Sequence, residues 1–394
     1  MKILLLAPCP FYQNRGTPIA IRLAARVLGE AGHQIHILTY PEGESVSIPN
    51  GSISRVPALP GIKNIKPGPS WKKLVYDLVM CFTLIKLVRK NRFDVIHAVE
   101  ESAFMALALK KIVHLPFVYD LDSSLSQQIG EKYRFLKPLT FILQRLEKKV
   151  IRESAGAIAV CRALEEDVLQ CAPEKLVCRL EDISLLSDPD GKTNRSATKT
   201  WEEPVIMYVG NLEKYQGIDL LLEGFQRALT KADSARLVII GGVEPDIKSF
   251  RKRSVELGLE KKVDFLGPKP LAELPYWLAQ ATILVSPRIR GNNTPMKIYS
   301  YLDSGKPVLA TRLPTHTQVL DDEIAWLADP TPEAMGEGLT QLLENGSLRD
   351  RLAQAARKKV QEEYCLEAYQ KKLLHFYDLL EVKLSGREKK ILGN

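Results

Sequence analysis

The sequence predicts an α/β protein built from two doubly wound domains, each with a parallel β-sheet covered by helices. At 394 residues, the chain is too long for one ordinary hydrophobic core. Short apolar runs alternate with amphipathic stretches in both halves, which is how parallel strands alternate with crossover helices. Between the halves, residues 184–203 lose this alternation and become polar and rich in turn residues.

These observations also predict the domain boundaries. We expect a first domain over residues 1–183, a linker over 184–203 and a second domain over 204–365. Residues 366–394 have helical spacing over much of their length, and we expect this segment to cross back onto the first domain.

The first half begins with an apolar run at Ile3–Leu6, which is too short for a signal peptide and is predicted to be a strand. Thr17 and Pro18 open the next helix and Gly32 closes it, so the loop before Gly16 lies at the carboxyl end of that strand. The further strands predicted in this half are Ile35–Thr39, Val95–Ala98, Phe117–Tyr119 and Ala157–Val160.

A helical pattern between Leu74 and Val88 combines apolar residues with Asp77 and Lys86, so it is too short and too charged to span a bilayer. It predicts either a helix that packs on the core or one that docks on a surface. Basic residues cluster between Lys63 and Arg92 and again between Lys137 and Arg152. With a net charge of +8 and a pI near 9.0, they favour an anionic partner, which we expect not to be a nucleic acid.

The second half repeats the alternation, with strands predicted at Val205–Gly210, Leu237–Ile240, Val263–Leu266, Thr282–Val285 and Val308–Ala310. Ligands of such sheets bind outside the carboxyl ends of the strands. The loops that carry Gly16, Gly210–Gly217 and the residues before Thr294 are therefore expected to line one cleft between the domains. Each glycine could also serve only to turn the chain.

The segment Ser286–Val308 is predicted to hold an anion. Thr294 is expected to cap a helix and Pro295 to take its first position, so that N–H groups from Met296 onward face the loop. Arg288 and Arg290 precede this helix, and Lys297 lies in its first turn, where acidic residues are usual. A bound phosphate group would account for three cations there. The nearby residues that could contact a sugar or ribose, or serve only the local backbone, are Asn292, Asn293 and Ser300.

Carboxylates follow two strands of the first half. Glu101, next to Glu100, could orient an acceptor hydroxyl, and Asp120 and Asp122 could orient a sugar or hold a divalent cation. His97 is read as a strand histidine that could be buried. The six cysteines form no C-x-x-C pair, which argues against zinc and a disulfide framework and suits a reducing cytoplasm.

These motifs, in this order, resemble the retaining nucleotide-sugar glycosyltransferases of family 4, which have the two-domain, Rossmann-like GT-B fold. The resemblance covers nearly the whole chain, and its carriers are Gly16, Asp94–Ala98, Val118–Asp122, Gly210–Glu223 and Pro295–Thr311. Some positions depart from the family pattern. Asn292 and Ser300 stand where two glutamates are usual, Asn211 and Gln216 replace an arginine and a lysine, and Asp122 replaces a histidine. The candidate substitute cations are Lys214, Arg288, Arg290 and Lys297.

The resemblance implies transfer of a sugar from a nucleotide-diphosphate sugar to an acceptor hydroxyl, with retention of configuration and without a metal or other cofactor. The basic first half suggests a carbohydrate or lipid-linked acceptor at the anionic inner face of a membrane, as in cell-envelope or polysaccharide synthesis. Because the usual glutamates and basic pair are missing, a catalytically silent GT-B subunit that binds a nucleotide or a partner is an alternative. A sugar-nucleotide epimerase on the same fold is another.

Overall fold

A computed structural model describes residues 1–65, 68, 70–126, 129, 137–187, 199–231 and 233–386. The chain divides into two compact units. Unit 1 is Met1–Glu181 together with the chain from Tyr369 onward, and unit 2 is Asp182–Ala368. Of the predicted linker, residues 188–198 lie outside the described residues, as do Lys66 and residues 387–394 of the final segment.

Unit 1 contains a seven-stranded sheet in the order β3-β2-β1-β4-β5-β6-β7. All of its neighbouring strands are parallel. Hydrophobic side chains fill both sides of β1, as the sequence of a strand buried between two layers requires. The strands are β1 (Lys2–Ala7), β2 (Gln34–Thr39), β3 (Gly51–Arg55), β4 (Val95–Val99), β5 (Phe117–Leu121), β6 (Gly156–Ala159) and β7 (Val177–Arg179).

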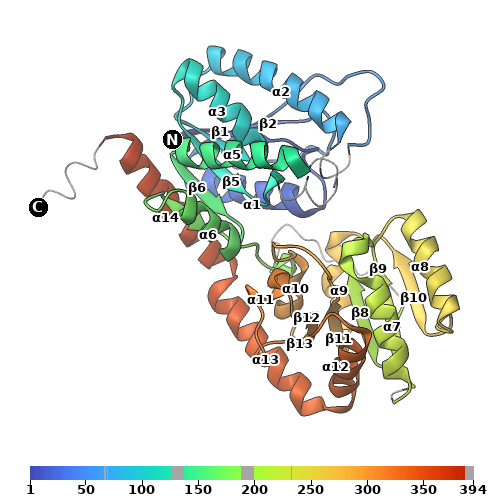
Figure 1. Ribbon diagram of the computed structural model, residues 1–394. Coiled ribbons are helices and arrows are strands. Elements are labelled where there is room, and N and C mark those ends of the chain that lie inside the picture. The colour runs from blue at the N-terminus through green and yellow to red at the C-terminus, as the bar shows by residue number, and fades with distance from the viewer. Residues whose placement is uncertain are drawn as a thin grey trace, which may run out of the picture. The chain divides into compact units, whose positions relative to one another are not determined.

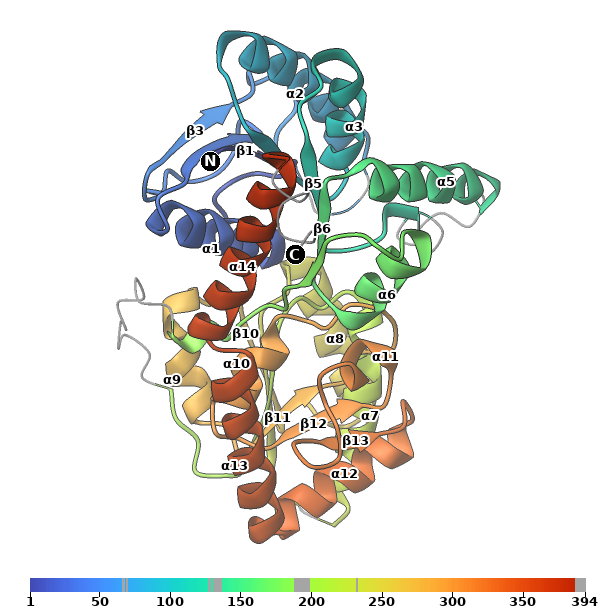
Figure 2. The same cartoon turned by 90° about the vertical axis from the view of Figure 1, so that its left-hand side faces the viewer.

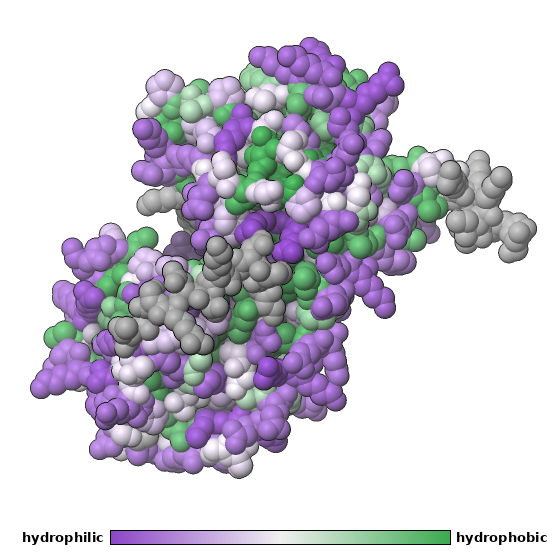
Figure 3. Space-filling view, turned by 180° about the vertical axis from the view of Figure 1, so that it is seen from behind, coloured by the Kyte–Doolittle hydropathy of each residue, from purple (hydrophilic) through white to green (hydrophobic). Residues whose placement is uncertain are grey.

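Helices cover both faces of this sheet. Figures 1 and 2 show α2, α3 and α5 on one side and α1 on the other. The face of unit 1 seen from behind is mostly hydrophilic, with one hydrophobic area near its centre (Figure 3). The helices are α1 (Gly16–Glu30), α2 (Trp71–Lys90), α3 (Ser102–Val113), α5 (Lys137–Glu153), α6 (Arg162–Cys171) and α14 (Leu366–Leu384).

The last helix, α14, begins at the end of unit 2 and belongs to unit 1 from Tyr369 onward. Its Tyr377 is buried, and its hydroxyl lies 2.7 Å from Nδ1 of His97 on β4. Phe376 packs against Gly156, where a Cβ would lie 2.8 Å from the phenyl ring. Among the described residues, no helix has the length and the apolar composition needed to cross a membrane.

Unit 2 contains a six-stranded parallel sheet in the order β10-β9-β8-β11-β12-β13. One hydrophobic cluster joins the sheet to α7, α8 and α12, and a second joins it to α9, α10 and α13. The strands are β8 (Val205–Val209), β9 (Arg236–Ile240), β10 (Val263–Gly267), β11 (Ile283–Ser286), β12 (Val308–Thr311) and β13 (Trp326–Ala328). The helices are α7 (Ile218–Leu229), α8 (Glu244–Glu256), α9 (Leu274–Ala279), α10 (Lys297–Asp303), α11 (Pro314–Thr317), α12 (Pro332–Glu344) and α13 (Gly346–Glu363).

The predicted fold class, two Rossmann-like parallel-sheet domains, is confirmed. The sequence pattern did not predict the edge strands β3, β7 and β13. No side chain of β3 or β7 is fully buried, and β13 has only three residues, so none of these strands shows the longer buried apolar run that marks a central parallel strand.

Candidate functional site

The loop after β8 in unit 2 is held in place by two glycines with positive φ. Gly210 has a φ of 154°, and a Cβ there would lie 2.9 Å from the Tyr208 hydroxyl. Gly217 has a φ of 73°, and a Cβ there would lie 1.9 Å from the carbonyl oxygen of Pro287. Both positions therefore need glycine for the fold itself, and they bring this loop against the segment that follows β11.

Two cations from that segment lie beside the loop. Arg288 is buried, and its Nη1 donates to the Asn293 carbonyl oxygen and to the Thr315 hydroxyl, each at 2.8 Å. Lys297 is partly buried, and its Nζ donates to Gln216 Oε1 at 3.3 Å and lies 3.8 Å from the centre of the Tyr208 ring. These contacts are made with neutral groups, so they leave the positive charge of each side chain uncompensated.

The electrostatics of this pair follow from that placement. Burial lowers the pKa of Arg288, and burial together with the charge of Arg288 lowers the pKa of Lys297 well below its usual range. No ion pair joins either cation to a carboxylate within the described ranges. A buried cation without a counter-ion is costly, so the arrangement suits an anionic ligand.

The predicted capping of α10 is wrong. The helix begins at Lys297 with Met296 at the N-cap position and no capping side chain. Pro295 and Met296 instead accept tight i→i+3 bonds from Ile298 and Tyr299, which delays the regular helix. Thr294 is buried, and its hydroxyl has no hydrogen-bond partner among the described residues. With only seven residues, α10 has a weak helix dipole, so the positive charge near its start comes from the side-chain cations.

The other predicted donor residues separate into exposed and buried groups. Ser300 is buried in α10, and its hydroxyl accepts from the backbone N–H of Leu185 at 3.0 Å, which gives it a structural role. The backbone carbonyl oxygen of Asn293 accepts a hydrogen bond from Arg288. The backbone carbonyl oxygen of Asn292 accepts one from the Gln318 side chain. The exposed residues are Asn211, Lys214, Arg290 and Asn292.

Sequence reasoning did not identify His316, which supports the segment around Arg288. Its Nε2 lies 2.9 Å from the Ser286 hydroxyl, and its Nδ1 lies 2.9 Å from the Thr311 carbonyl oxygen. Burial lowers the pKa of His316 to about 3, so the ring is neutral near pH 7. Thr311 in turn donates to the Arg288 carbonyl oxygen at 2.5 Å. No motif around His316 signals this role, because its partners come from other elements.

A second cluster of polar side chains lies at the carboxyl ends of the strands in unit 1. Lys73 of α2 lies 2.5 Å from Glu101 and 3.8 Å from Glu100, which both follow β4. Tyr40, which follows β2, donates to Asp77 of α2 at 2.5 Å. Burial raises the pKa of Glu101 to about 8 and that of Asp77 to about 6. Glu101 thus retains a proton more readily than an exposed glutamate although Lys73 is adjacent, because burial and neighbouring carboxylates oppose its charge.

Of the predicted aspartates, Asp120 lies near the end of the neighbouring strand β5, and Asp122 follows that strand. Asp120 is bonded to His97 Nε2 at 2.9 Å, and His97 also contacts Tyr377 of α14, so three elements fix this carboxylate. Asp122, two residues further on, is partly buried. Gly16 begins α1 with an exposed position, and a Cβ there would meet no atom within 4 Å. Packing within unit 1 therefore does not require glycine at this position.

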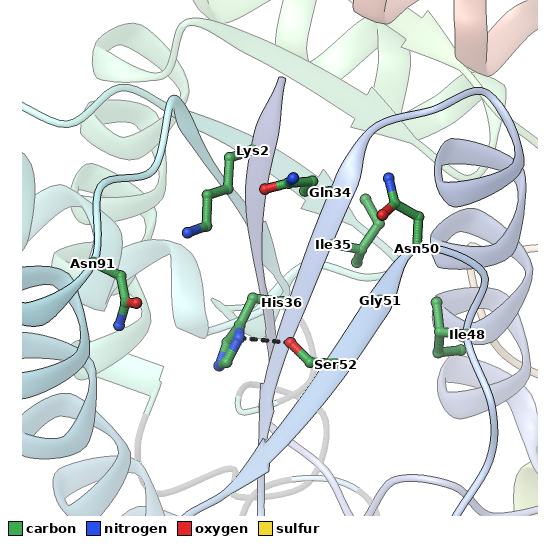
Figure 4. A pocket seen from close by; sticks show the side chains of 9 residues that line it. All are labelled: Lys2, Gln34, Ile35, His36, Ile48, Asn50, Gly51, Ser52 and Asn91. Atoms are coloured by element: carbon green, nitrogen blue, oxygen red, sulfur yellow. Dashed lines mark hydrogen bonds between the residues drawn. The ribbon is translucent and has the colours of Figure 1, made fainter.

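A cavity of about 540 Å³ lies at the opposite, amino-terminal edge of the unit 1 sheet (Figure 4). Lys2, Gln34 and Gly51, the first residues of three adjacent strands, line it. In Figure 4, Ser52 and His36 are joined by a hydrogen bond of 2.8 Å. Because ligands of doubly wound sheets bind at the carboxyl edge, this cavity is separate from the candidate site.

Comparison with known proteins gives a consistent family. Residues 191–359 match the model described as glycosyl transferases group 1, and residues 15–178 match glycosyltransferase family 4. The D-inositol 3-phosphate glycosyltransferase of Corynebacterium glutamicum is 30% identical, over 86% of this chain and 86% of that protein. The phosphatidyl-myo-inositol mannosyltransferase of Mycobacterium leprae is 23% identical, over 91% and 92%.

Solved structures agree with this fold. The sucrose-phosphate synthase of Thermosynechococcus elongatus superimposes with a TM-score of 0.78 at 19% identity, over 97% of this chain and 99% of that one. The Anabaena protein HepE, in complex with UDP-glucose, superimposes with a TM-score of 0.74 at 15% identity, over 96% and 100%. Both likenesses support the two-domain parallel-sheet fold described above.

Proposed function

We propose that this chain, which belongs to the glycosyl transferases group 1 family and is a glycosyltransferase with the GT-B fold, moves a sugar from a nucleotide-diphosphate sugar to an acceptor hydroxyl with retention of configuration. Cell-envelope, polysaccharide or glycolipid synthesis at the cytoplasmic face of a membrane is the proposed setting. The relatives named for inositol phosphate and phosphatidylinositol acceptors support an acceptor that is a polyol or is linked to a lipid.

The observation that carries the donor proposal is the pair Arg288 and Lys297, two cations withdrawn from water beside the Gly210–Gly217 loop, neither of which forms an ion pair with a carboxylate in the described part of the chain. A diphosphate supplies the missing negative charge and accepts charge-assisted hydrogen bonds. The UDP-glucose bound by HepE supports the same class of donor.

Lys297 also accounts for one departure from the family pattern. Gln216 stands where a lysine is usual, and Lys297 Nζ lies 3.3 Å from the Gln216 side chain. A lysine that comes from α10 instead of from the β8 loop thus delivers its charge to the same place. In the transferase reaction, the bond between the sugar and the diphosphate breaks, and negative charge grows on the leaving oxygens. Cations already fixed at that point lower the barrier without reorganising.

The acceptor side of the proposal rests on unit 1. Asp120 is fixed by His97, and Asp122, Glu100 and Glu101 follow strands at the same edge of the sheet, so carboxyl oxygens are available to orient a hydroxyl. The open space at Gly16 would let a phosphate approach the backbone N–H groups at the start of α1, a helix of 15 residues.

Thermal unfolding with UDP, GDP, ADP, TDP and CMP tests the donor site. Selective binding to the folded state stabilises by about 2.7 kcal/mol at a hundredfold excess over Kd. We expect one diphosphate to stabilise the protein, and we expect the effect to weaken more in Lys297→Met than in Lys214→Met, which changes the exposed candidate lysine of the β8 loop. No stabilisation by any nucleotide would favour the silent-subunit alternative, which the missing glutamates support. Turnover without an acceptor to a rearranged sugar nucleotide would instead indicate an epimerase.

A further inference from the structure

The outward face of α2 exposes a row of large apolar side chains. Trp71, Leu74, Leu78 and Phe82 recur every third or fourth residue, which places them along one side of the helix. Their exposed fractions lie between 58% and 68%. The inward side of the same helix is occupied by Tyr76, Met80 and Leu84, which are fully buried. The outward row is therefore additional to what the core of unit 1 requires.

The charged residues of α2 also differ between its inward and outward sides. Its single acidic residue, Asp77, faces inward and accepts from Tyr40, and Lys73 faces inward to Glu101. The exposed row of apolar residues continues at its carboxyl end into Lys86, Arg89 and Lys90. The outward face therefore presents apolar and positively charged groups without an acid to balance them.

Neighbouring helices extend this surface. Figures 1 and 2 show α3 and α5 on the same side of the sheet as α2, and α3 contacts both of the others. On α5, Phe141 and Ile142 are more than half exposed, and the guanidinium of Arg145 lies over the Phe141 ring. A second group of apolar residues flanked by a cation thus lies on the same layer of helices.

We propose that the outward face of α2 docks on an anionic lipid bilayer, with Trp71, Leu74, Leu78 and Phe82 entering the headgroup boundary and the basic end of the helix meeting lipid phosphates. A helix that combines an apolar row with lysines and arginines has the composition for lying in such an interface. A second copy of this chain fits less well, because antiparallel pairing of two α2 helices would place Lys72 of one opposite the Arg89 and Lys90 of the other.

The docking surface extends the proposed transferase function. The inference that the acceptor is linked to a lipid depends on that proposed function. The inward side of α2 holds Lys73 against Glu101 at the carboxyl edge of the sheet. One helix therefore joins the lipid-facing surface to the edge where the acceptor hydroxyl is proposed to bind, and the acceptor of this docked protein is a lipid-linked one.

Vesicle co-sedimentation tests the docking. The full chain is mixed at low salt with vesicles of phosphatidylglycerol or phosphatidylcholine, and Leu78→Glu is compared with Val255→Glu on α8. Leu78 and Val255 are exposed to 58% and 59%, and both changes add one negative charge, so the pair is matched. We expect the unaltered chain to bind phosphatidylglycerol vesicles. Leu78→Glu should weaken this binding about tenfold or more, as the loss of one leucine from the lipid boundary predicts. Val255→Glu should bind with nearly the affinity of the unaltered chain.

The fluorescence of Trp71 supplies a second readout, because acrylamide should quench it less when phosphatidylglycerol vesicles are present. The Trp71→Phe variant measures the fluorescence of the other tryptophans, which is subtracted. Absence of binding to phosphatidylglycerol at low salt would overturn the docking proposal, as would equal loss in the two glutamate variants. A dimer that Leu78→Glu dissociates, without vesicle binding, would assign the surface to a second copy instead. Nucleotide stabilisation of each variant, measured separately, reports on the donor site in unit 2, so failure of docking and failure of the transferase proposal remain distinguishable.

Discussion

Replacing Lys297 with methionine is the sharpest test of the donor site, because methionine keeps most of the side-chain length and removes the ammonium group with its charge and its hydrogen-bond donors. The Nζ of Lys297 lies 3.3 Å from Gln216 Oε1 and 3.8 Å from the Tyr208 ring centre, so a diphosphate beside the loop would lie within direct contact of it. A hydrogen bond to a charged group contributes about 1.5–3 kcal/mol, which corresponds to roughly a 10- to 150-fold weaker Kd in the variant.

The pH dependence of binding gives the same test an independent readout. Burial lowers the pKa of Lys297 in the empty protein, and a bound diphosphate should raise it again. Between those two pKa values, binding takes up a proton, so affinity should fall as the pH rises through that window. In Lys297→Met, this component of the pH dependence should disappear.

Folding stability should respond in the opposite sense to binding. The unfolded chain ionises Lys297 with the ordinary lysine pKa and thus holds more protons than the folded chain between the lowered and the ordinary values, so stability rises with pH there. Removing the charge should leave the empty protein at least as stable as the unaltered chain. A lower Tm without nucleotide would contradict this.

Isothermal titration with the nucleotide that stabilises best, in Hepes and in Tris at several pH values, measures both affinity and proton uptake. Lys214→Met is the comparison variant, because Lys214 is the other candidate lysine and lies exposed on the β8 loop. The reasoning would be refuted if Lys297→Met bound with unchanged affinity and unchanged proton uptake, or if Lys214→Met alone weakened binding.

Further predictions concern the fold and the acceptor edge. Gly217→Ala should lower the free energy of unfolding in urea by about 3 kcal/mol or more, because its Cβ would lie 1.9 Å from the Pro287 carbonyl oxygen. Gly305→Ala, at a position with a φ of 70° and open space around it, should lower it by only about 1–2 kcal/mol. Equal losses in the two variants would contradict the packing explanation. Tyr377→Phe should destabilise by about 1–3 kcal/mol in the same assay and shift the His97 ring signals in NMR spectra, since a buried partner of His97 is lost. Glu101 has a folded pKa of about 8 against 4.5 for an ordinary glutamate, so the folded state holds the extra proton between those values and stability should fall as the pH rises toward 8. Glu101→Gln should flatten that decline, and an unchanged slope would place its cause elsewhere.

The limits of sequence reasoning are clear at α10. A Thr-Pro pair before an apolar run is a good predictor of a helix start, yet regular helix begins two residues after Pro295, because tight i→i+3 bonds come first. Arg288 and Arg290 likewise cannot be told apart from the local sequence, because both are arginines that precede the predicted helix start. Both follow the end of β11 at Ser286, yet the first is buried against Thr315 and the second is exposed, because only Arg288 finds partners in the segment that follows β12, all of which the structure describes.

The sequence by itself determined the two parallel-sheet domains, their central strands and the glycines of the turns, because buried strands and backbone turns impose local patterns on neighbouring residues. Only the tertiary structure brings Lys297 to the loop after β8, where it meets Gln216 across a separation of 81 residues. It also decided the orientation of α2. The sequence favours a core-facing helix there and leaves a surface-docking one as the alternative, and only the packing of Tyr76, Met80 and Leu84 shows that the row from Trp71 to Phe82 is exposed to solvent.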